Sequence, residues 1–294
     1  MSKPLAGVYA ALTTPFVGDE VSIDRMKDNV RKLNASGLDG YLVLGSTGEC
    51  VSLTDGESLA LVDAVLEEAA PGKKVLVGTA RESTRSTVAF TNSLPCRGLA
   101  AVLVRPPSYY RSKMTRLALA GHFLAVAEGS KHPVLLYNMP QNTGVSLEPG
   151  LVVDLAAHGN VAGLKESSGS LGFLAEVAGR VPERFHYFLG SGQVVYPGLE
   201  LGADGAILAV ADAVPEAAAE LYALWKAGRR DEARRLQLDL APLNKALTET
   251  YGIAGLKYAQ DLRGYYGGPV RLPLLPVDEK GRAEIAALLE SMGF

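Results

Sequence analysis

The chain has 294 residues, of which 48% are hydrophobic, and a formal net charge of -3 from 29 basic and 32 acidic residues. This length allows one large domain or two medium ones with a sizeable core. The nearly balanced charge provides no basic surface for nucleic acid or membrane, and no apolar run approaches the roughly 18 residues of a membrane-spanning helix. We therefore expect neither a nucleic-acid partner nor a membrane partner.

The cysteines and the N-terminal residues bear on the cellular compartment. Cys50 and Cys96 are too few for a disulfide framework, so a reduced, cytoplasmic setting is expected. The first residues, MSKPLAGVYAALTTPF, contain neither a long apolar segment nor a cleavage site, and they predict no signal peptide.

Eight short, almost continuously apolar segments recur along the first 225 residues. Such segments are typical of strands that are buried on both faces of a parallel sheet. In chain order they are 7–16 (GVYAALTTPF), 40–46 (GYLVLGS), 74–80 (KVLVGTA), 98–107 (GLAAVLVRPP), 133–140 (PVLLYNMP), 161–168 (VAGLKESS), 186–192 (HYFLGSG) and 205–211 (GAILAVA).

The segments between these strands have helical periodicity. After the first strand, Ile23, Met26 and Val30 fall on one helical face, and Thr54 and Glu57 have the spacing of a capping box before the next helix. Eight strand–helix units predict an α/β fold, a (β/α)8 TIM barrel. An open doubly wound sheet is the alternative, which the number of strands does not exclude.

Beyond residue 225 the strand pattern ends. The remaining sequence has the pattern of several helices, including 252–268 and 277–294. We therefore predict two parts, a (β/α)8 barrel over residues 1–225 and a C-terminal helical extension over residues 226–294.

In a barrel of this kind the active site lies at the carboxyl ends of the strands. The predicted strands end on hydroxyl groups, tyrosines and one lysine: Thr13 and Thr14, Gly45–Glu49, Ser108–Tyr110, Tyr137 and Asn138, Lys165, and Ser191. The four histidines have no metal-ligand spacing, and neither glycine-rich stretch (GSTGE or GSGQVV) completes a nucleotide-binding motif. No metal and no cofactor are therefore expected.

Lys165 is the residue that suggests a chemistry. A lysine at a strand end ordinarily extends its ammonium into solvent. If the barrel mouth buries it, however, its pKa falls from about 10.4 by up to roughly 3–5 units, and the neutral amine can attack a carbonyl. The imine that forms is an electron sink, so an adjacent carbon can make or break a bond.

Two further features fit this chemistry, although each alone has an ordinary structural explanation. Tyr137 is a candidate for moving protons near the imine. The hydroxyl and N–H groups of the Gly45–Thr47 stretch, at the start of a helix, can hold the carboxylate of a 2-oxo acid.

Three motifs resemble the dihydrodipicolinate synthase / N-acetylneuraminate lyase superfamily of class I aldolases. They are GSTGE (45–49), YNMPQNTG (137–144) and GLKESSG (163–169), and their order and spacing match over essentially the whole chain. In detail, SYYRSKM (108–114) and GYYGGPVRLPL (264–274) look closest to the 4-hydroxy-2-oxoglutarate aldolase branch.

The resemblance implies roles for individual residues and a homotetramer, a dimer of dimers. Lys165 would form the imine with pyruvate or with a substrate that yields pyruvate, and Tyr137 would transfer protons. The other implied site residues are Ser46 and Thr47 (carboxylate binding and proton relay), Tyr109 or Tyr110 (lent to a neighbouring subunit), Ser167 (substrate contact) and Ile207 (a backbone carbonyl facing the imine).

One position departs from the dihydrodipicolinate synthase pattern. Those enzymes have an arginine that holds the carboxylate of aspartate semialdehyde where this chain has Asn142, and an amide cannot replace a bidentate guanidinium. Arg81, Arg105 or Arg111 could stand in for it.

The expected reaction is therefore cleavage of a 4-hydroxy-2-oxo acid, such as 4-hydroxy-2-oxoglutarate, to pyruvate and an aldehyde. The alternatives are dihydrodipicolinate synthase, other lyases and dehydratases of the superfamily, and a catalytically inactive barrel that senses a 2-oxo acid.

Overall fold

The eight predicted strands form a closed parallel barrel. The computed structural model describes residues 3–96 and 98–294. The strand order is β1-β10-β9-β8-β7-β6-β5-β4, so the (β/α)8 barrel is confirmed and the open sheet is excluded. The barrel strands are β1 (Gly7–Ala11), β4 (Gly40–Val43), β5 (Lys74–Gly78), β6 (Leu99–Val104), β7 (Val134–Asn138), β8 (Val161–Glu166), β9 (His186–Leu189) and β10 (Gly205–Leu208).

Contacts within the chain define two compact units. One comprises Leu76–Ala206 with the N-terminal residues up to Ala6, and the other comprises Gly7–Val75 with Ile207–Phe294. The predicted boundary at residue 225 rests instead on the change from a strand pattern to a helical pattern in the sequence, and it stays a prediction.

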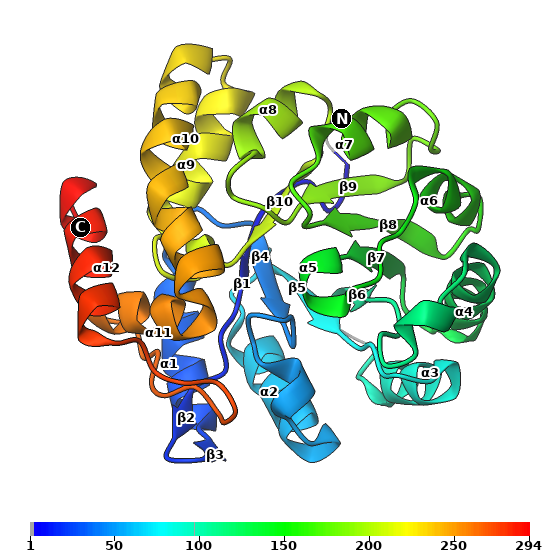
Figure 1. Cartoon of the computed structure of the whole chain (residues 1–294), viewed down its shortest axis with the longest axis horizontal. Helices are drawn as coiled ribbons and strands as arrows, with labels where there is room; N and C mark the ends of the chain where they lie inside the picture. The colour runs from blue at the N-terminus through cyan, green and yellow to red at the C-terminus, as the bar shows by residue number, and fades with distance from the viewer. Residues whose placement is uncertain (1–2, 97) are drawn as a thin grey trace. The chain divides into compact units, whose positions relative to one another are not determined.

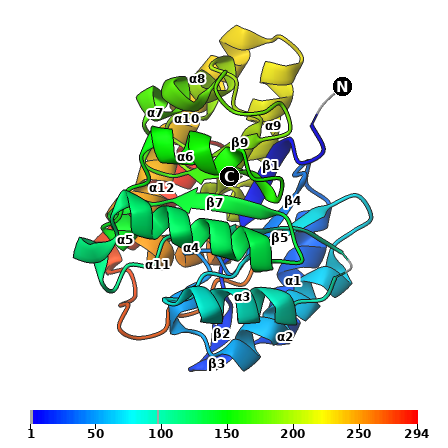
Figure 2. The same cartoon turned by 90° about the vertical axis from the view of Figure 1, so that its right-hand side faces the viewer.

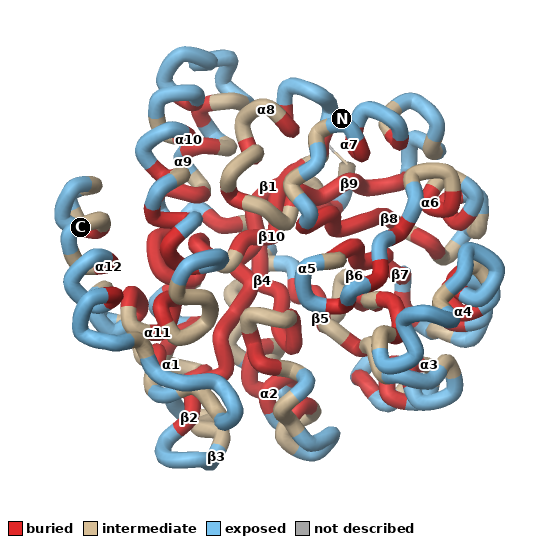
Figure 3. Tube along the Cα trace, viewed as in Figure 1, coloured by how far each residue is buried: buried red, intermediate tan, exposed pale blue. Residues whose placement is uncertain are grey.

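In the first unit, β6 to β9 lie side by side in parallel register. Leu136 pairs with Leu164, and Lys165 pairs with Phe188. These strands are buried almost throughout (Figure 3), as their apolar sequences predict. Successive helices pack against one another along them (Figures 1 and 2): α3 (Thr84–Ser93), α4 (Arg116–Gly129), α6 (Pro149–Ala156), α7 (Leu171–Val177) and α8 (Val195–Glu200). Two short helices, η2 (Arg111–Lys113) and α5 (Pro140–Thr143), follow the ends of β6 and β7.

In the second unit, β1 pairs in parallel with β4, and Tyr9 lies opposite Gly40. An antiparallel hairpin of β2 (Phe16–Val17) and β3 (Glu20–Val21) was not expected, because strands of two residues show no periodicity. The capping box of Thr54 and Glu57 is confirmed at the start of α2 (Asp55–Glu68). The other helices are α1 (Ile23–Asn34), η1 (Cys50–Ser52), η3 (Val210–Asp212), α9 (Pro215–Lys226), α10 (Arg230–Lys245), η4 (Ala246–Thr250), α11 (Gly252–Leu262) and α12 (Glu279–Ser291).

After residue 226 the chain forms helices, as predicted, but the helix predicted over 252–268 ends at Leu262 and residues 263–278 are irregular. Helix α10 packs against α9 (Figure 1). α10 continues directly into η4, a turn of π-helix, and the helix is interrupted at Tyr251 and Gly252, where φ of Gly252 is 58°. Within the described residues, no helix combines the length and the apolar character needed to cross a membrane.

Candidate active site

Lys165 lies near the end of β8 and is buried. It pairs in register with Tyr137 of β7 on one side and with Phe188 of β9 on the other. Only 4% of the residue is exposed, and its Nζ lies 4.7 Å from the centre of the Tyr137 ring. The ordinary solvent-directed position of a strand-end lysine therefore does not apply here.

This burial changes the acidity of the amine. Desolvation disfavours the ammonium and lowers the pKa of Lys165 from 10.5 to about 7. At neutral pH a substantial fraction of the side chain is therefore the neutral amine, which is the form that attacks a carbonyl.

Tyr137 presents its ring to Lys165 and is itself 5% exposed. Its hydroxyl donates to Sδ of Met139 at 2.8 Å. A thioether is a weak acceptor, so this contact holds the hydroxyl only weakly.

A polar network that the sequence did not predict joins the ends of β7 and β8. The Glu166 carboxylate accepts from Asn138 Nδ2 at 3.1 Å and from the Ser168 N–H at 2.8 Å. Asn138 Oδ1 in turn accepts from the Leu147 N–H at 2.9 Å. Because side chains alternate along a strand, Asn138 and Glu166 point to the opposite face from Tyr137 and Lys165. They fix the loops that follow the two candidate residues.

Ser167 is held in the same loop by backbone contacts. Its N–H donates to the carbonyl of Asn138, and its own carbonyl accepts from Gln141 Nε2 at 2.9 Å. A Cβ atom at Gly190 would lie 1.8 Å from Ser167 Oγ, so the absence of a side chain at Gly190 makes room for Ser167.

Asn142 is exposed on the short helix α5. The three arginines that could replace its missing guanidinium differ in the contacts that their side chains make. Arg81 lies 3.7 Å above the Phe90 ring, and Arg105 pairs with Glu82 at 2.9 Å.

Arg111 lies beside the residue that ends α5: its Nη1 is 3.4 Å from where a Cβ of Gly144 would be. Within the described part of the chain, no carboxylate pairs with Arg111. It is the arginine best placed to bind a carboxylate near Asn142.

Tyr109 and Tyr110 form an exposed aromatic pair. They are 78% and 69% exposed, and their rings meet edge to face with centroids 5.0 Å apart. The loop that carries them is anchored by Glu82, which accepts from the N–H groups of Ser108 and Tyr109 at 2.9 Å each.

The second unit carries Ser46, Thr47 and Ile207. Ile207 is fully buried in β10. Ser46 and Thr47 are half-buried in the turn after β4, and this turn has a left-handed residue at each side, Leu44 (φ 58°) and Glu49 (φ 53°). Side chains other than glycine adopt this conformation at a cost, so the turn must be held by its surroundings.

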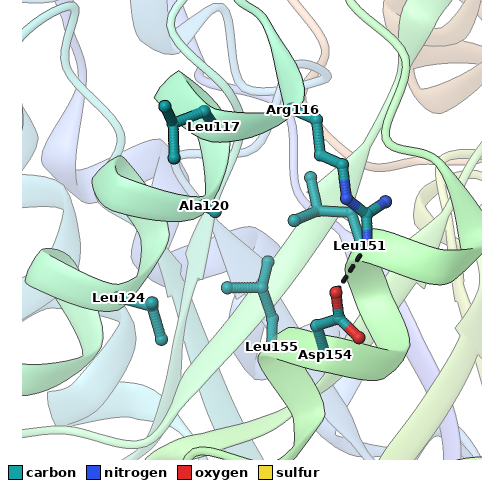
Figure 4. A pocket seen from close by; sticks show the side chains of 7 residues that line it. All are labelled: Arg116, Leu117, Ala120, Leu124, Leu151, Asp154 and Leu155. Atoms are coloured by element: carbon teal, nitrogen blue, oxygen red, sulfur yellow. Dashed lines mark hydrogen bonds and ion pairs between the residues drawn. The ribbon is translucent and has the colours of Figure 1, made fainter.

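A separate groove of about 210 Å³ lies between α4 and α6 (Figure 4). Its rim is the ion pair of Arg116 with Asp154, at 2.5 Å. None of the predicted site residues lines it; its lining is Arg116, Leu117, Ala120, Leu124, Leu151, Asp154 and Leu155. Over residues 3–96 and 98–294, no group of three or more His, Cys, Asp or Glu side chains is arranged to hold a metal ion.

A closed parallel barrel with a desolvated lysine at a strand end is the arrangement of the enzymes that work through a lysine imine, the class I aldolases. The model of the dihydrodipicolinate synthetase family matches residues 4–292. The chain belongs to this family and is a pyruvate-dependent class I lyase of the carbon–carbon bond.

Individual relatives agree with this assignment. A 4-hydroxy-tetrahydrodipicolinate synthase from Listeria welshimeri is 34% identical, with 98% of this chain and 99% of the relative covered. One from Methanosphaerula palustris is also 34% identical, over 97% and 98% of the two chains. Among solved structures, dihydrodipicolinate synthase from Thermotoga maritima is similar with a TM-score of 0.92, 29% identity and 98% coverage of each chain. A structure described as the first monomeric dihydrodipicolinate synthase variant gives a TM-score of 0.93 at 28% identity, over 99% and 98% of the two chains.

Proposed function

We propose that Lys165 is the residue that forms the imine with pyruvate. The observation that carries this proposal is a lysine that is 4% exposed at a strand end, with a pKa lowered to about 7 by burial alone. The neutral amine adds to the keto carbon of pyruvate, and water leaves as the imine forms. Loss of a proton from the methyl carbon then gives an enamine, whose carbon joins the carbonyl carbon of an aldehyde. Cleavage is the reverse of these steps.

Tyr137 is the proton-transferring residue in this proposal, because its ring borders the Lys165 amine. Thr47 and Ser46 are assigned to proton relay and carboxylate binding, Ser167 to a substrate contact and the Ile207 carbonyl to the imine. These four assignments are supported by the match of each position to the family motifs. Asn142 is assigned to the aldehyde end of the substrate.

Of the two reactions considered, the relatives favour condensation of pyruvate with aspartate semialdehyde, as in 4-hydroxy-tetrahydrodipicolinate synthase. We take this as the leading function, which reverses the order that the sequence motifs alone suggested. Arg111, beside α5, could supply the guanidinium that Asn142 lacks. Cleavage of 4-hydroxy-2-oxoglutarate is the second candidate, and the specific observation in its favour is Asn142 itself.

Steady-state kinetics with both substrates test the choice. We expect pyruvate-dependent consumption of aspartate semialdehyde with a higher kcat/KM than pyruvate release from 4-hydroxy-2-oxoglutarate. The opposite ratio would assign the chain to the second reaction. Turnover of neither substrate, with no pyruvate adduct on Lys165, would contradict both candidate reactions and favour the sensor hypothesis.

The working unit proposed is a homotetramer in which Tyr109 or Tyr110 enters the site of a neighbouring subunit. Two exposed aromatic rings on an anchored loop support this, because such rings are enriched at interfaces. We also propose a reduced, cytoplasmic location, which is supported by the fact that neither Cys50 nor Cys96 forms a disulfide.

A further inference from the structure

A second lysine is buried in the second unit, and it comes from the C-terminal helices. Lys257 of α11 is 1% exposed, and its Nζ lies 2.5 Å from Oε1 of Glu49. The same ammonium donates to the carbonyl of Pro269 at 2.7 Å and lies 4.4 Å above the ring of Phe16. Because both side chains of the pair are withdrawn from solvent, each charge depends on the other.

Glu49 is the last residue of the strained turn after β4. Its backbone is left-handed, and the carboxylate of its side chain is held from two directions. Lys257 engages Oε1, and the N–H of Arg271 donates to Oε2 at 2.9 Å. Both partners belong to the C-terminal part of the chain. Their contacts therefore hold Glu49 in its left-handed conformation.

The turn that Glu49 closes is the one that carries Ser46 and Thr47. The Glu49 N–H donates to the carbonyl of Ser46 at 3.1 Å. At the intervening residue, the Gly48 carbonyl accepts from Thr14 Oγ1 at 2.6 Å. The two residues that follow Thr47 are thus anchored, Gly48 by the hydroxyl of Thr14 and Glu49 by its buried ion pair with Lys257.

We propose that Lys257 is a positioning residue that acts through Glu49 to fix the hydroxyl of Thr47 for proton relay. The inference rests on the proposed function, which gives Thr47 that role. A neutral side chain at position 257 would remove one of the two contacts that hold the side chain of residue 49, whether or not that residue keeps its charge. Loss of this contact would release the left-handed backbone and displace the turn. An error of about 1 Å in a catalytic group can reduce the rate about 10²-fold.

The ion pair should therefore affect proton transfer and leave imine formation intact. In Lys257→Met we expect borohydride to trap saturating pyruvate on Lys165 at the wild-type level, while kcat falls about 10²-fold. In the Thr47→Val background, Lys257→Met should cause no further loss of kcat, because the residue through which it acts is already disabled. A purely structural role would instead give losses that multiply.

Lys257→Met leaves a buried carboxylate unpaired and can fail to fold, so the paired variant Glu49→Gln/Lys257→Met is the second test. It removes both charges, and replacement of a buried pair by neutral groups is often tolerated. We expect a wild-type Tm with the same loss of kcat. The control is Arg263→Met. Arg263 is a partly buried cation at the end of the same helix, and it pairs with Glu216 and not with Glu49.

The outcomes separate this proposal from the proposed function. Wild-type kcat in the paired variant, losses that multiply in the Thr47→Val background, or a paired variant that does not fold would each overturn the positioning role. A wild-type enzyme that yields no pyruvate adduct on Lys165 would overturn the proposed function instead.

Discussion

In the proposed mechanism, the Lys165 amine determines the pH at which the reaction can begin. Its folded pKa is about 7 and its ordinary pKa is 10.5, so the folded protein releases this proton at a pH where a free lysine would hold it. We expect the initial rate of borohydride trapping with pyruvate to rise with pH and to reach half its maximum near pH 7. Mass spectrometry of the peptide that contains Lys165 measures this.

The same experiment contains its own control. Lys257 is equally buried, but it is paired with Glu49 and should carry no adduct. A pyruvyl group on Lys257, or a trapping profile with its midpoint near pH 10, would contradict the assignment of Lys165.

Tyr137 is the second residue whose role can be measured directly. General acid–base groups contribute about 10²- to 10⁴-fold to the rate, so Tyr137→Phe should lower kcat by that factor. Its stability should change little, because the phenylalanine ring fills the same buried space.

Tyr187 provides a matched control for this substitution. It is a buried tyrosine on the adjacent strand β9, and it pairs with Leu164, which faces away from Lys165. Its hydroxyl has no hydrogen-bond partner among the described residues. Tyr187→Phe should therefore keep the wild-type kcat. If Tyr137→Phe also keeps it, Tyr137 is a core residue only.

At the scale of elements, we predict that the short helix α5 governs the choice of substrate. The aldehyde of the leading reaction carries a carboxylate, and a hydrogen bond between charged groups is worth about 1.5–3 kcal/mol, or roughly 10- to 150-fold in kcat/KM. We expect Arg111→Met to lower kcat/KM for aspartate semialdehyde by about this factor. Asn142→Arg should raise it again in the Arg111→Met background.

Borohydride trapping of pyruvate in both variants shows whether Lys165 is still functional. The matched control is Arg105→Met, because that guanidinium is already engaged by Glu82. If Arg111→Met left kcat/KM unchanged for both candidate substrates, Arg111 would have no role in recognising the aldehyde.

The elements differed in how well the sequence predicted them. The barrel strands were predictable because apolar residues fill both faces of β7, β8 and β9. Lys165 and Tyr137 stood out because each interrupts such a run near the end of a strand. The hairpin β2–β3 and the helix α5 were not predicted, because two to four residues are too few to show a period.

Contacts between positions far apart in the sequence could not be predicted, for another reason. Glu49 was part of a recognised motif, and Lys257 was part of a helix, but nothing in either local pattern indicates that the two charges meet. The same holds for Asn138 and Glu166, whose pairing follows from the register of β7 with β8.

At the scale of the whole molecule, the number of subunits is the open prediction. A tetramer that shares Tyr109 or Tyr110 between subunits predicts that Tyr109→Ala or Tyr110→Ala lowers kcat, although both side chains are exposed in the single chain. Sedimentation velocity with activity measured on each species is the test. A fully active monomer would contradict this prediction, and a solved relative is described as a monomeric variant.

The end of β1 has a consequence for how the protein is made in the cell. The buried N–H of Thr13 donates to Asp212, and the Thr13 hydroxyl donates to Gln260, 247 residues further along the chain. At about 5–20 residues per second, the ribosome reaches Gln260 roughly 12–50 s after Thr13. During that interval the first strand has been synthesised but lacks its final partners. The nascent barrel therefore exposes unpaired strand edges, which chaperones can protect from aggregation. A chain that stops before Gln260 should aggregate instead of accumulating as a smaller folded enzyme.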